Sequence, residues 1–355
     1  MTLSRLRVSG LRNLAAADVQ LAAGTNVVTG ANGAGKTSIL EGIHILGRGR
    51  SFRSARLDRV RTGGNAPLRV QGEVHVAGYW HRLGVGRDEA GTRARLDGAD
   101  ARNLSALARL LPVQVINSES ERLVQDGPAG RRSFLNWTVF HVEPDYHAAW
   151  QRAERALRQR NVALRSGDQR TAVALEAEVS QAGERVHELR ERTMAALEPL
   201  VSGYLGEWLP GLDVAVRYRR GWSAERSLGD ALARARTSDQ HMGYTTTGPQ
   251  RADLALRVDG MEARDRLSRG QQKLLVLALL VGQVRLLGTS GHADPLLLVD
   301  DLPAELDEQS RGLVLRAVEA IHGQSVLTAI ERESLAIEAD AWFHVEQGTP
   351  REMIR

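Results

Sequence analysis

The sequence predicts an α/β fold that is interrupted by a helical insert. Strand-like segments with glycine-rich turns occupy both ends of the 355-residue chain, whereas the middle has helical periodicity. A glycine-rich loop lies between a strand and a helix in the first part, and an aliphatic strand in the last part ends in two carboxylates. Two halves of one α/β unit, mixed sheets flanked by helices, account for these features.

The strand candidates of the first part alternate or run apolar between glycine-rich breaks. They are residues 3–8, 25–29, 68–76, 81–86 and 111–116. In the last part we expect a strand at 253–258, a long helix from Ser268, a strand at 296–299, a helix at 308–322 and strands at 325–329 and 342–345. We therefore assign residues 1–120 and 244–355 to one split domain.

The insert, residues 121–243, is expected to form a short helical arm. Residues 146–164 are typical of an amphipathic helix, with a turn at 165–168, and residues 223–243 form a polar, glycine-containing stretch. The spacing of a coiled-coil seam is largely followed by Leu175, Val179, Ala182, Val186, Leu189 and Leu197. A plain buried helix hairpin inside a single domain is the alternative.

Composition excludes several classes of protein. Cysteine is absent, which removes disulfides, iron–sulfur clusters and cysteine nucleophiles. The first ten residues alternate like a strand and not like a signal peptide, and the apolar run 274–281 is far shorter than the roughly 20 residues of a membrane helix. We expect a cytoplasmic protein without a membrane partner. The net charge of +4 argues only weakly for a polyanionic partner, but the chain's two lysines, Lys36 and Lys273, both fall in the motifs below.

The glycine-rich loop matches G-x-x-x-x-G-K-[ST] between a strand and a helix. Its glycines let successive backbone N–H groups point at an anion, and the following helix N-terminus adds its dipole. We expect Lys36 to reach the β- and γ-phosphates of ATP and the Thr37 hydroxyl to ligate Mg²⁺. The expected nucleotide-binding residues are Gly30, Ala31, Asn32, Gly33, Ala34, Gly35, Lys36, Thr37 and Ser38.

Two acids follow the aliphatic strand 296–299. P-loop proteins place the Mg²⁺-organising Asp at the carboxyl end of such a strand, a role that we assign to Asp300. Asp301 is expected to act as the general base that orients water against the γ-phosphate.

A third motif, Ser268-Arg269-Gly270-Gln271, opens the long helix. A Ser-x-Gly-Gln sequence at a helix start offers a hydroxyl, backbone N–H groups and a positive dipole end, which together suit an anion. An ordinary Ser N-cap with nothing bound is the alternative.

With Ala304-Glu305-Leu306-Asp307 after the acids, the three motifs resemble the ABC-type ATPase heads. This resemblance implies that Ser268 and Gly270 act catalytically in trans on the γ-phosphate of a second subunit, so that ATP holds a homodimer together. The insert separates the possible relatives. At 1.5 Å per helical residue its longer helix spans about 50 Å, far less than the arms of SMC and Rad50 proteins.

Further segments, spread over nearly the whole chain, resemble the RecF family. They are residues 10–13, 40–43, 49–53, 126–135, 141–144, 159–161 and 248–254. We add Arg12 of the first segment to the residues expected to bind ATP. The chain departs from the family at Gln250, where His is usual, and it has no His after the strand that ends near Thr328, so we expect slow hydrolysis.

Six arginines between residues 48 and 61 are the candidate DNA contacts, because guanidinium groups suit phosphate. They are Arg48, Arg50, Arg53, Arg56, Arg59 and Arg61. No module that reads bases is found, so we expect contacts to the DNA backbone with little sequence preference. A solvated arginine-rich face is the alternative.

The resemblance to the RecF family implies an ATP-gated clamp on duplex DNA near single-strand gaps. It also implies cooperation with RecR and RecO, a role in DNA repair, replication, recombination and the SOS response, and weak, DNA-stimulated ATP hydrolysis. An ABC transporter ATPase subunit and a nucleotide-regulated scaffold that never hydrolyses ATP are the alternatives.

Overall fold

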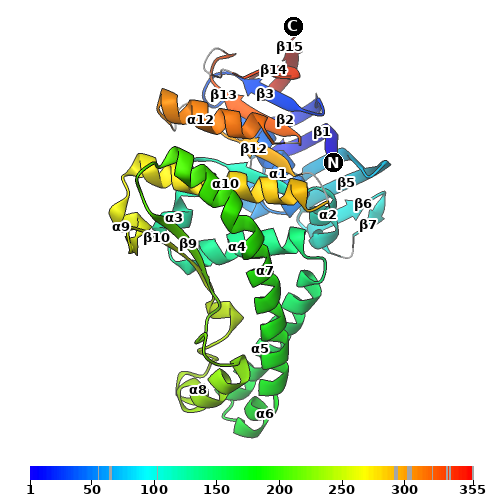
Figure 1. Cartoon of the computed structure of the whole chain (residues 1–355). Helices are drawn as coiled ribbons and strands as arrows, with labels where there is room; N and C mark the ends of the chain where they lie inside the picture. Colours follow the sequence, from blue (N-terminus) through cyan, green and yellow to red (C-terminus); the bar gives the residue numbers. More distant parts are fainter. Residues whose placement is uncertain are drawn as a thin grey trace. The chain divides into compact units, whose positions relative to one another are not determined.

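A computed structural model of the chain describes residues 1–54, 56–63, 66–101, 103–291, 295–301, 306–321, 323–332, 335 and 337–353. The chain divides into two compact units, residues 1–120 with 279–355 and residues 121–278. Each contains its own sheet and helices (Figure 1). The first unit is thus built from both ends of the sequence.

An antiparallel sheet of six strands forms one layer of the first unit. Its strands, in spatial order, are β2 (Leu14–Gln20), β1 (Thr2–Leu11), β4 (Leu68–Val76), β5 (Tyr79–Asp88), β6 (Gly91–Leu96) and β7 (Ala99–Asp100). Along β4, buried residues such as Val70 and Val74 alternate with exposed polar ones such as Arg69 and Gln71. One face of this sheet therefore belongs to the core, and the other faces solvent.

A second, mixed sheet of six strands holds the carboxyl ends that matter for function. Its order is β15 (Thr349–Met353), β14 (Ala341–Glu346), β3 (Thr25–Thr29), β13 (Ser325–Ala329), β12 (Leu296–Val299) and β8 (Val113–Ile116). The pairings from β14 through β8 are all parallel, and only β15 is antiparallel. Parallel strands end at the same edge, so the residues after β3, β12 and β13 are brought together there.

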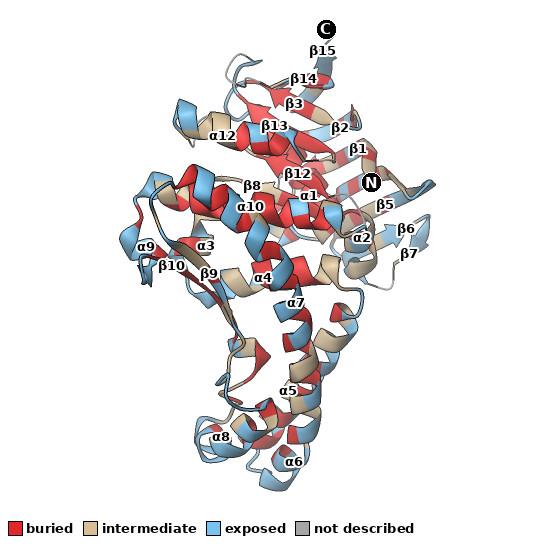
Figure 2. Cartoon of the chain, viewed as in Figure 1, coloured by how far each residue is buried: buried red, intermediate tan, exposed pale blue. Residues whose placement is uncertain are grey.

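Helix α1 (Lys36–Arg48) packs on the inner face of the antiparallel sheet. Its Ile39, Leu40, Ile43 and Leu46 are fully buried in the same core cluster as residues of both sheets. The remaining helices of this unit are η1 (Leu57–Val60), α2 (Leu104–Leu110) and α12 (Glu308–Glu319), with η2 (Ser118–Glu121) at the junction between the units. Figure 2 shows the buried residues concentrated on α1 and on the central strands of the mixed sheet.

The second unit contains most of the long helices. Its helices are α3 (Arg122–Gln125), α4 (Pro128–Val142), α5 (Tyr146–Arg165), α6 (Gln169–Ala174), α7 (Glu176–Trp208), α8 (Leu228–Met242), η3 (Pro249–Arg251) and α9 (Ala263–Arg266). A three-stranded antiparallel sheet joins β9 (Val214–Arg219), β10 (Asp253–Val258) and β11 (Met261–Glu262). Helices α5 and α7 lie side by side, and the expected seam residues Val179, Ala182, Val186 and Leu189 are buried (Figure 1).

The second unit extends further along the chain than the insert that we assigned. The structure places the boundary after Ala278, whereas the sequence suggested residue 243. Strand β10 pairs with β9 from Asp253↔Arg219 to Val258↔Val214, which ties residues 253–258 to the insert. Such a pairing leaves no mark in local periodicity.

Several elements were not expected from the sequence. Among them are the strands β2, β6, β7, β9, β11 and β15 and the helices α2, α4 and α8. Helix α8 lies within the polar, glycine-containing stretch 223–243, and its N-terminus is capped by the Ser227 side chain, which accepts from Asp230 N. The expected helix 308–322 ends at Glu319, and His322 lies outside the described residues.

Helix α10 (Arg269–Thr289) is apolar on all sides. It is the one helix among the described residues that is long and apolar enough to cross a membrane, and 78% of its most apolar window is buried. Buried all round, it is typical of the core helix of a large protein.

Candidate nucleotide-binding site

The loop between β3 and α1 adopts backbone conformations that require glycine. Gly30, Gly33 and Gly35 have φ values of 147°, 80° and 121°. A Cβ on Gly30 would also lie 2.4 Å from the carbonyl oxygen of Val345. The loop therefore curves tightly ahead of the α1 N-terminus, the arrangement in which P-loops surround phosphate.

Asn13 braces this loop from the end of the first hairpin. Its Nδ2 donates to the carbonyl oxygen of Gly33 at 2.9 Å, and its Oδ1 accepts from Ser38 Oγ at 2.9 Å. One side chain thus joins the middle of the loop to the first turn of α1. In the sequence Asn13 stands out only as part of a RecF-like segment, because its partners Gly33 and Ser38 are brought to it by the fold.

The Lys36 ammonium points back into the loop. It donates to the carbonyl oxygens of Gly30, at 2.7 Å, and Ala31, at 3.2 Å. Burial lowers the pKa of Lys36, while the nearby Asp301 and Asp300 carboxylates oppose that shift. No carboxylate of the described residues lies within ion-pair distance of it. Its charge is therefore held by neutral acceptors and can be directed at an anion.

The carboxyl edge of the mixed sheet assembles the acid pair with two hydroxyl groups. Asp300 Oδ1 accepts from Thr37 Oγ1 and from Thr328 Oγ1, each at 2.9 Å. Thr328 Oγ1 in turn accepts from Asp301 N at 2.9 Å. Burial raises the pKa of Asp300, although the two hydroxyl donors work against it. Thr37 and Asp300, the expected Mg²⁺ ligands, are thus in direct contact.

Thr328 links the two acids of the pair. Its hydroxyl both donates to Asp300 and accepts from Asp301, and the residue is buried. It positions the acid pair and is not directed at water. Asp301 adopts a positive φ of 55°, which is uncommon for a residue with a side chain and is a form of local strain found at functional sites.

The residues present suit MgATP better than a metal ion alone. Among the described residues there is no group of three or more His, Asp or Glu side chains that could hold a metal. Mg²⁺ in P-loop sites takes one or two protein ligands and several oxygens from phosphate and water. A single hydroxyl and a single carboxylate, beside a phosphate-binding loop, fit that requirement.

Arg12, one of the residues expected to bind ATP, contacts Glu41 of α1. Its guanidinium donates to Glu41 through Nε, at 3.0 Å, and Nη2, at 3.1 Å, and Glu41 is fully buried. The Ser51 hydroxyl donates to the same carboxylate. Arg12 thereby ties the segment after β1 to the start of the arginine-rich segment.

The six arginines between residues 48 and 61 differ in exposure. Arg50, Arg53, Arg56 and Arg59 are exposed. Arg48 donates to the carbonyl oxygen of Val113, and burial lowers its pKa to about 9; Arg61 donates to the carbonyl oxygen of Ala66. Arg53 lies close enough to Asp300 to lower the pKa of that carboxyl. One arginine assigned to DNA is therefore a neighbour of the acid pair.

The Ser268 motif forms a capping box at the start of α10. Ser268 N donates to Gln271 Oε1 at 3.0 Å, and Gln271 N donates to Ser268 Oγ at 3.3 Å. Ser268 and Gly270 are exposed, and no atom lies within 4 Å of a Cβ built on Gly270. Lys273 forms an ion pair with Glu121 at 3.5 Å. Of the segment after the acids, Ala304 and Glu305 lie outside the described residues, and Asp307 caps α12.

The fold and the site together define a P-loop nucleotide-binding head of the ABC type, as in the SMC-like ATPases. The structure matches one described as the recombination mediator protein RecF-ATP in the RecFOR pathway, with a TM-score of 0.87, 22% identity and coverage of 99% of this chain and 98% of that one. It matches the SmcHead bound to the C-winged helix domain of ScpA with a TM-score of 0.62, 15% identity and coverage of 99% and 97%.

Sequence comparison narrows this class to one family. Residues 2–351 match the family described as the RecF/RecN/SMC N terminal domain. The chain is 44% identical over 360 residues to the DNA replication and repair protein RecF of Pseudomonas fluorescens, covering 98% of this chain and 97% of that protein. A Pseudomonas putida protein of the same name is 43% identical with the same coverage. The chain belongs to the RecF family, which confirms the resemblance and favours it over a transporter ATPase subunit.

Proposed function

We propose that the chain is an ATP-gated DNA-binding protein. Two copies close on ATP, hold duplex DNA near single-strand gaps and release it after slow hydrolysis, in support of recombinase loading. The relatives are DNA replication and repair proteins, and a structural neighbour is described as RecF-ATP in the RecFOR pathway. RecR- and RecO-type mediators and a cytoplasmic location follow from the same likeness.

The observation that carries this proposal is the unfinished charge arrangement at the carboxyl edge of the mixed sheet. Lys36 has only carbonyl partners, and the raised pKa of Asp300 reports a carboxylate that burial penalises. An anion beside Lys36 would balance its positive charge, and a cation beside Asp300 would offset the free-energy cost of burying its carboxylate. MgATP supplies both, together with the phosphoanhydride bond whose hydrolysis ends the closed state.

In this site each residue of the chain has a distinct task. The loop 30–38 and Lys36 bind phosphate, and Thr37 and Asp300 hold Mg²⁺. Asp301, whose backbone is fixed by Thr328, orients water and accepts its proton. Since the sequence has no His directly after β13, hydrolysis is slow, and the nucleotide sets how long the closed state lasts.

The Ser268 motif supports a dimer in which each copy completes the other's site. Its hydroxyl and the first N–H groups of α10 are exposed, and Gly270 leaves them accessible. An exposed helix start with glycine as its second residue suits the γ-phosphate of a second copy. Within one copy, the motif needs no partner beyond its own capping box.

Sedimentation velocity with and without ATP, and with and without gapped DNA, tests the proposal. We expect an ATP-dependent dimer that binds DNA, and we expect Ser268→Arg to remain monomeric. Ser227→Arg is the matched control, because Ser227 caps α8 in the same unit with the same geometry. A protein that stays monomeric when saturated with ATP, or a Ser268→Arg variant that dimerises normally, contradicts the proposal.

Hydrolysis is tested separately with Asp301→Asn. This variant is expected to bind ATP and to accumulate as a dimer, because an amide cannot accept the proton of water. Normal hydrolysis by Asp301→Asn would show that another group is the base.

A further inference from the structure

The solvent face of the antiparallel sheet is hollowed. Two adjoining depressions of ≈ 380 Å³ and ≈ 540 Å³ share Gln71, Gly84 and Arg95. They extend over β1, β4, β5 and β6, on the face opposite the buried Leu83 and Val85. We call this depression the sheet trough. Its lining includes no P-loop residue and none of the six arginines at 48–61.

The floor of the sheet trough is bare because β5 has glycine at two successive outward positions. Gly84 and Gly86 pair continuously with β4 and β6, without a bulge. Neither has positive φ, and a Cβ on either would make only ordinary contacts, the nearest at 3.7 Å for Gly84 and 3.6 Å for Gly86. Neither the backbone nor the packing requires glycine there. Glycine weakens a strand, and it often marks close approach of a ligand.

Arginines stand on both sides of this floor. One row across strands β1, β4, β5 and β6 consists of Arg7, Gln71, Gly84 and Arg95, each paired with the next. The neighbouring outward row across β4, β5 and β6 consists of Arg69, Gly86 and Arg93. The distance from β1 to β6 is three strand spacings, or about 14 Å. A duplex, whose two grooves alone measure about 12 and 6 Å, is broader than this. A single sugar–phosphate backbone is narrow enough to lie between the arginines of β1 and β6.

Arginines outnumber acids in the lining. The arginines of the two depressions are Arg5, Arg7, Arg69, Arg82, Arg87, Arg93 and Arg95, and the acids are Glu73 and Asp88. Arg5 and Arg7 share Asp18, Arg87 pairs with Asp58, and Arg95 pairs with Asp100. Arg69, Arg82 and Arg93 are exposed and form no ion pair within the described part of the chain. Guanidinium groups in such a row match successive phosphates.

An exposed aromatic side chain lies at the end of the sheet trough. Trp80 is 64% exposed, follows the same outward alternation as Arg82, and stands opposite His75, with ring centroids 5.0 Å apart. Aromatic residues make up only 4% of the chain, and this one is exposed and not packed in the core. An arginine-lined groove with an exposed aromatic platform is how sequence-neutral proteins bind unpaired bases.

We propose that the sheet trough binds single-stranded DNA, with the sugar–phosphate backbone over Gly84 and Gly86 and a base stacked on Trp80. The inference rests on the proposed function, since it assigns the single-stranded side of a gap to a surface separate from the one that holds duplex. An acidic protein segment would match the positive charge of the trough. It would not need an exposed indole for stacking, or a glycine floor wide enough for one sugar–phosphate backbone.

Fluorescence anisotropy with a labelled oligo-dT of about 15 nucleotides tests the sheet trough. Arg93→Glu is expected to weaken binding and to lower the salt slope by about 0.7 or more, as loss of one phosphate contact requires. Trp80→Ala is expected to weaken binding roughly tenfold, and Gly84→Leu, which changes no charge, to do so by filling the floor. Arg351→Glu is the matched control, because Arg351 is an exposed strand arginine of the other sheet in the same unit.

Three outcomes separate this proposal from the proposed function. Loss of oligo-dT binding in the trough variants, with ATP-dependent dimerisation and duplex binding retained, supports the trough. If the three variants bind oligo-dT like the unaltered chain, or if poly-glutamate displaces oligo-dT as well as unlabelled oligo-dT does, the trough proposal is overturned while the clamp stands. If the unaltered chain binds oligo-dT in the trough but never dimerises with ATP, only the clamp fails.

Discussion

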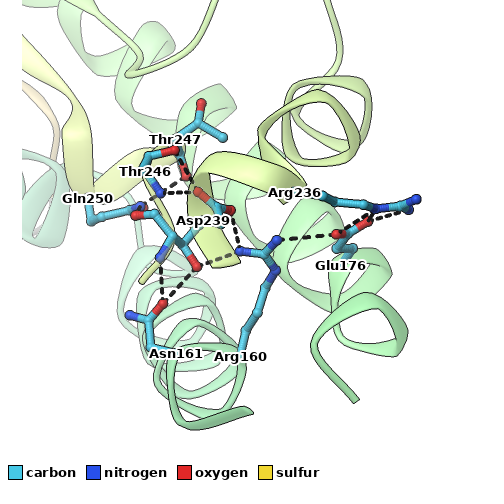
Figure 3. Close-up of polar contacts among 9 residues, drawn as sticks. Arg160, Asn161, Glu176, Arg236, Asp239, Thr246, Thr247 and Gln250 are labelled. Carbon is cyan, nitrogen blue, oxygen red and sulfur yellow. Dashed lines mark hydrogen bonds and ion pairs between the residues drawn. The ribbon is translucent and has the colours of Figure 1, made fainter. Parts of the chain in front are cut away.

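Two buried cations in this chain have opposite surroundings. In the second unit, Arg160 is 1% exposed and donates to Asp239 at 2.7 Å, to Thr245 Oγ1 at 2.7 Å and to Glu176 at 3.2 Å (Figure 3). Arg236 reaches the same Glu176, so the charges in this cluster balance closely. In the first unit, Lys36 has no carboxylate within ion-pair distance among the described residues, and its partners are carbonyl oxygens.

The difference separates a structural cluster from a binding site. The partners of Arg160 are themselves held: Asp239 accepts from Thr246 N and Oγ1, and Thr245 donates to Asn161 (Figure 3). This cluster joins α5, α7 and α8 to the loop before η3, and its positive and negative side chains are paired with one another. The Lys36 site is electrostatically incomplete, and an incomplete site gains free energy when a charged ligand binds.

Removing Arg160 should therefore destabilise the protein most. Arg160→Ala leaves Asp239 buried without its cation, which typically costs about 3–5 kcal/mol. Urea unfolding followed by circular dichroism, with hydrogen exchange of residues 239–250, measures the loss. Arg152→Ala is the control on the same helix, because the Arg152–Glu178 pair is exposed and should contribute little. Equal effects of the two substitutions would refute the contrast.

Lys36→Ala should show the reverse pattern. Because Lys36 has only neutral partners, we expect its removal to change the free energy of unfolding by no more than about 1 kcal/mol. Loss of its charge-assisted bonds to phosphate should weaken MgATP binding by roughly 10- to 100-fold and abolish ATP-dependent dimerisation. Isothermal titration calorimetry and sedimentation measure both. A variant that is strongly destabilised but still binds ATP normally would show that Lys36 is structural.

The pH dependence of stability should reveal Asp300. Burial raises its pKa above the ordinary value of 3.8, so the folded state keeps this proton to higher pH than the unfolded state. Stability from this group is then lost as the pH rises from about 4 through the raised pKa. Asp300→Asn should remove that slope and raise the Tm of the nucleotide-free protein at pH 7 by about 2–4 °C. A lower Tm for Asp300→Asn would mean that the carboxylate stabilises the fold.

Local patterns predicted the parts of this molecule that depend on local physics. The strands 25–29, 68–76, 253–258, 296–299 and 325–329 appear with the expected bounds, because short aliphatic or alternating runs between turn residues have few other solutions. The contact between Thr37 and Asp300 follows from parallel strands ending at one edge. Both features can be deduced without knowing the tertiary contacts.

Features that depend on distant parts of the chain could not be predicted in this way. The brace from Asn13 to Gly33 and the bidentate contact of Arg12 with Glu41 join residues 20 and 29 positions apart. The pairing of β9 with β10, which moves the boundary to Ala278, joins strands on either side of α8. The bare floor formed by Gly84 and Gly86 is visible only once the outward face of β5 is known.

The substitution Gln250→His, which introduces the residue expected here from the resemblance to the family, should have the smallest effect. Gln250 Nε2 donates to the carbonyl oxygens of Thr245, at 3.3 Å, and Thr247, at 3.0 Å, while its Oε1 is buried without a partner in the described structure. A neutral imidazole keeps one donor and one unpaired acceptor, so at pH 8 the change should be below about 1 kcal/mol. Gln250→Leu removes both donors and should cost about 1–3 kcal/mol. Thermal unfolding of the two variants decides the point: if His costs as much as Leu, the Arg160 cluster needs both hydrogen bonds of the amide, and this chain has come to depend on glutamine.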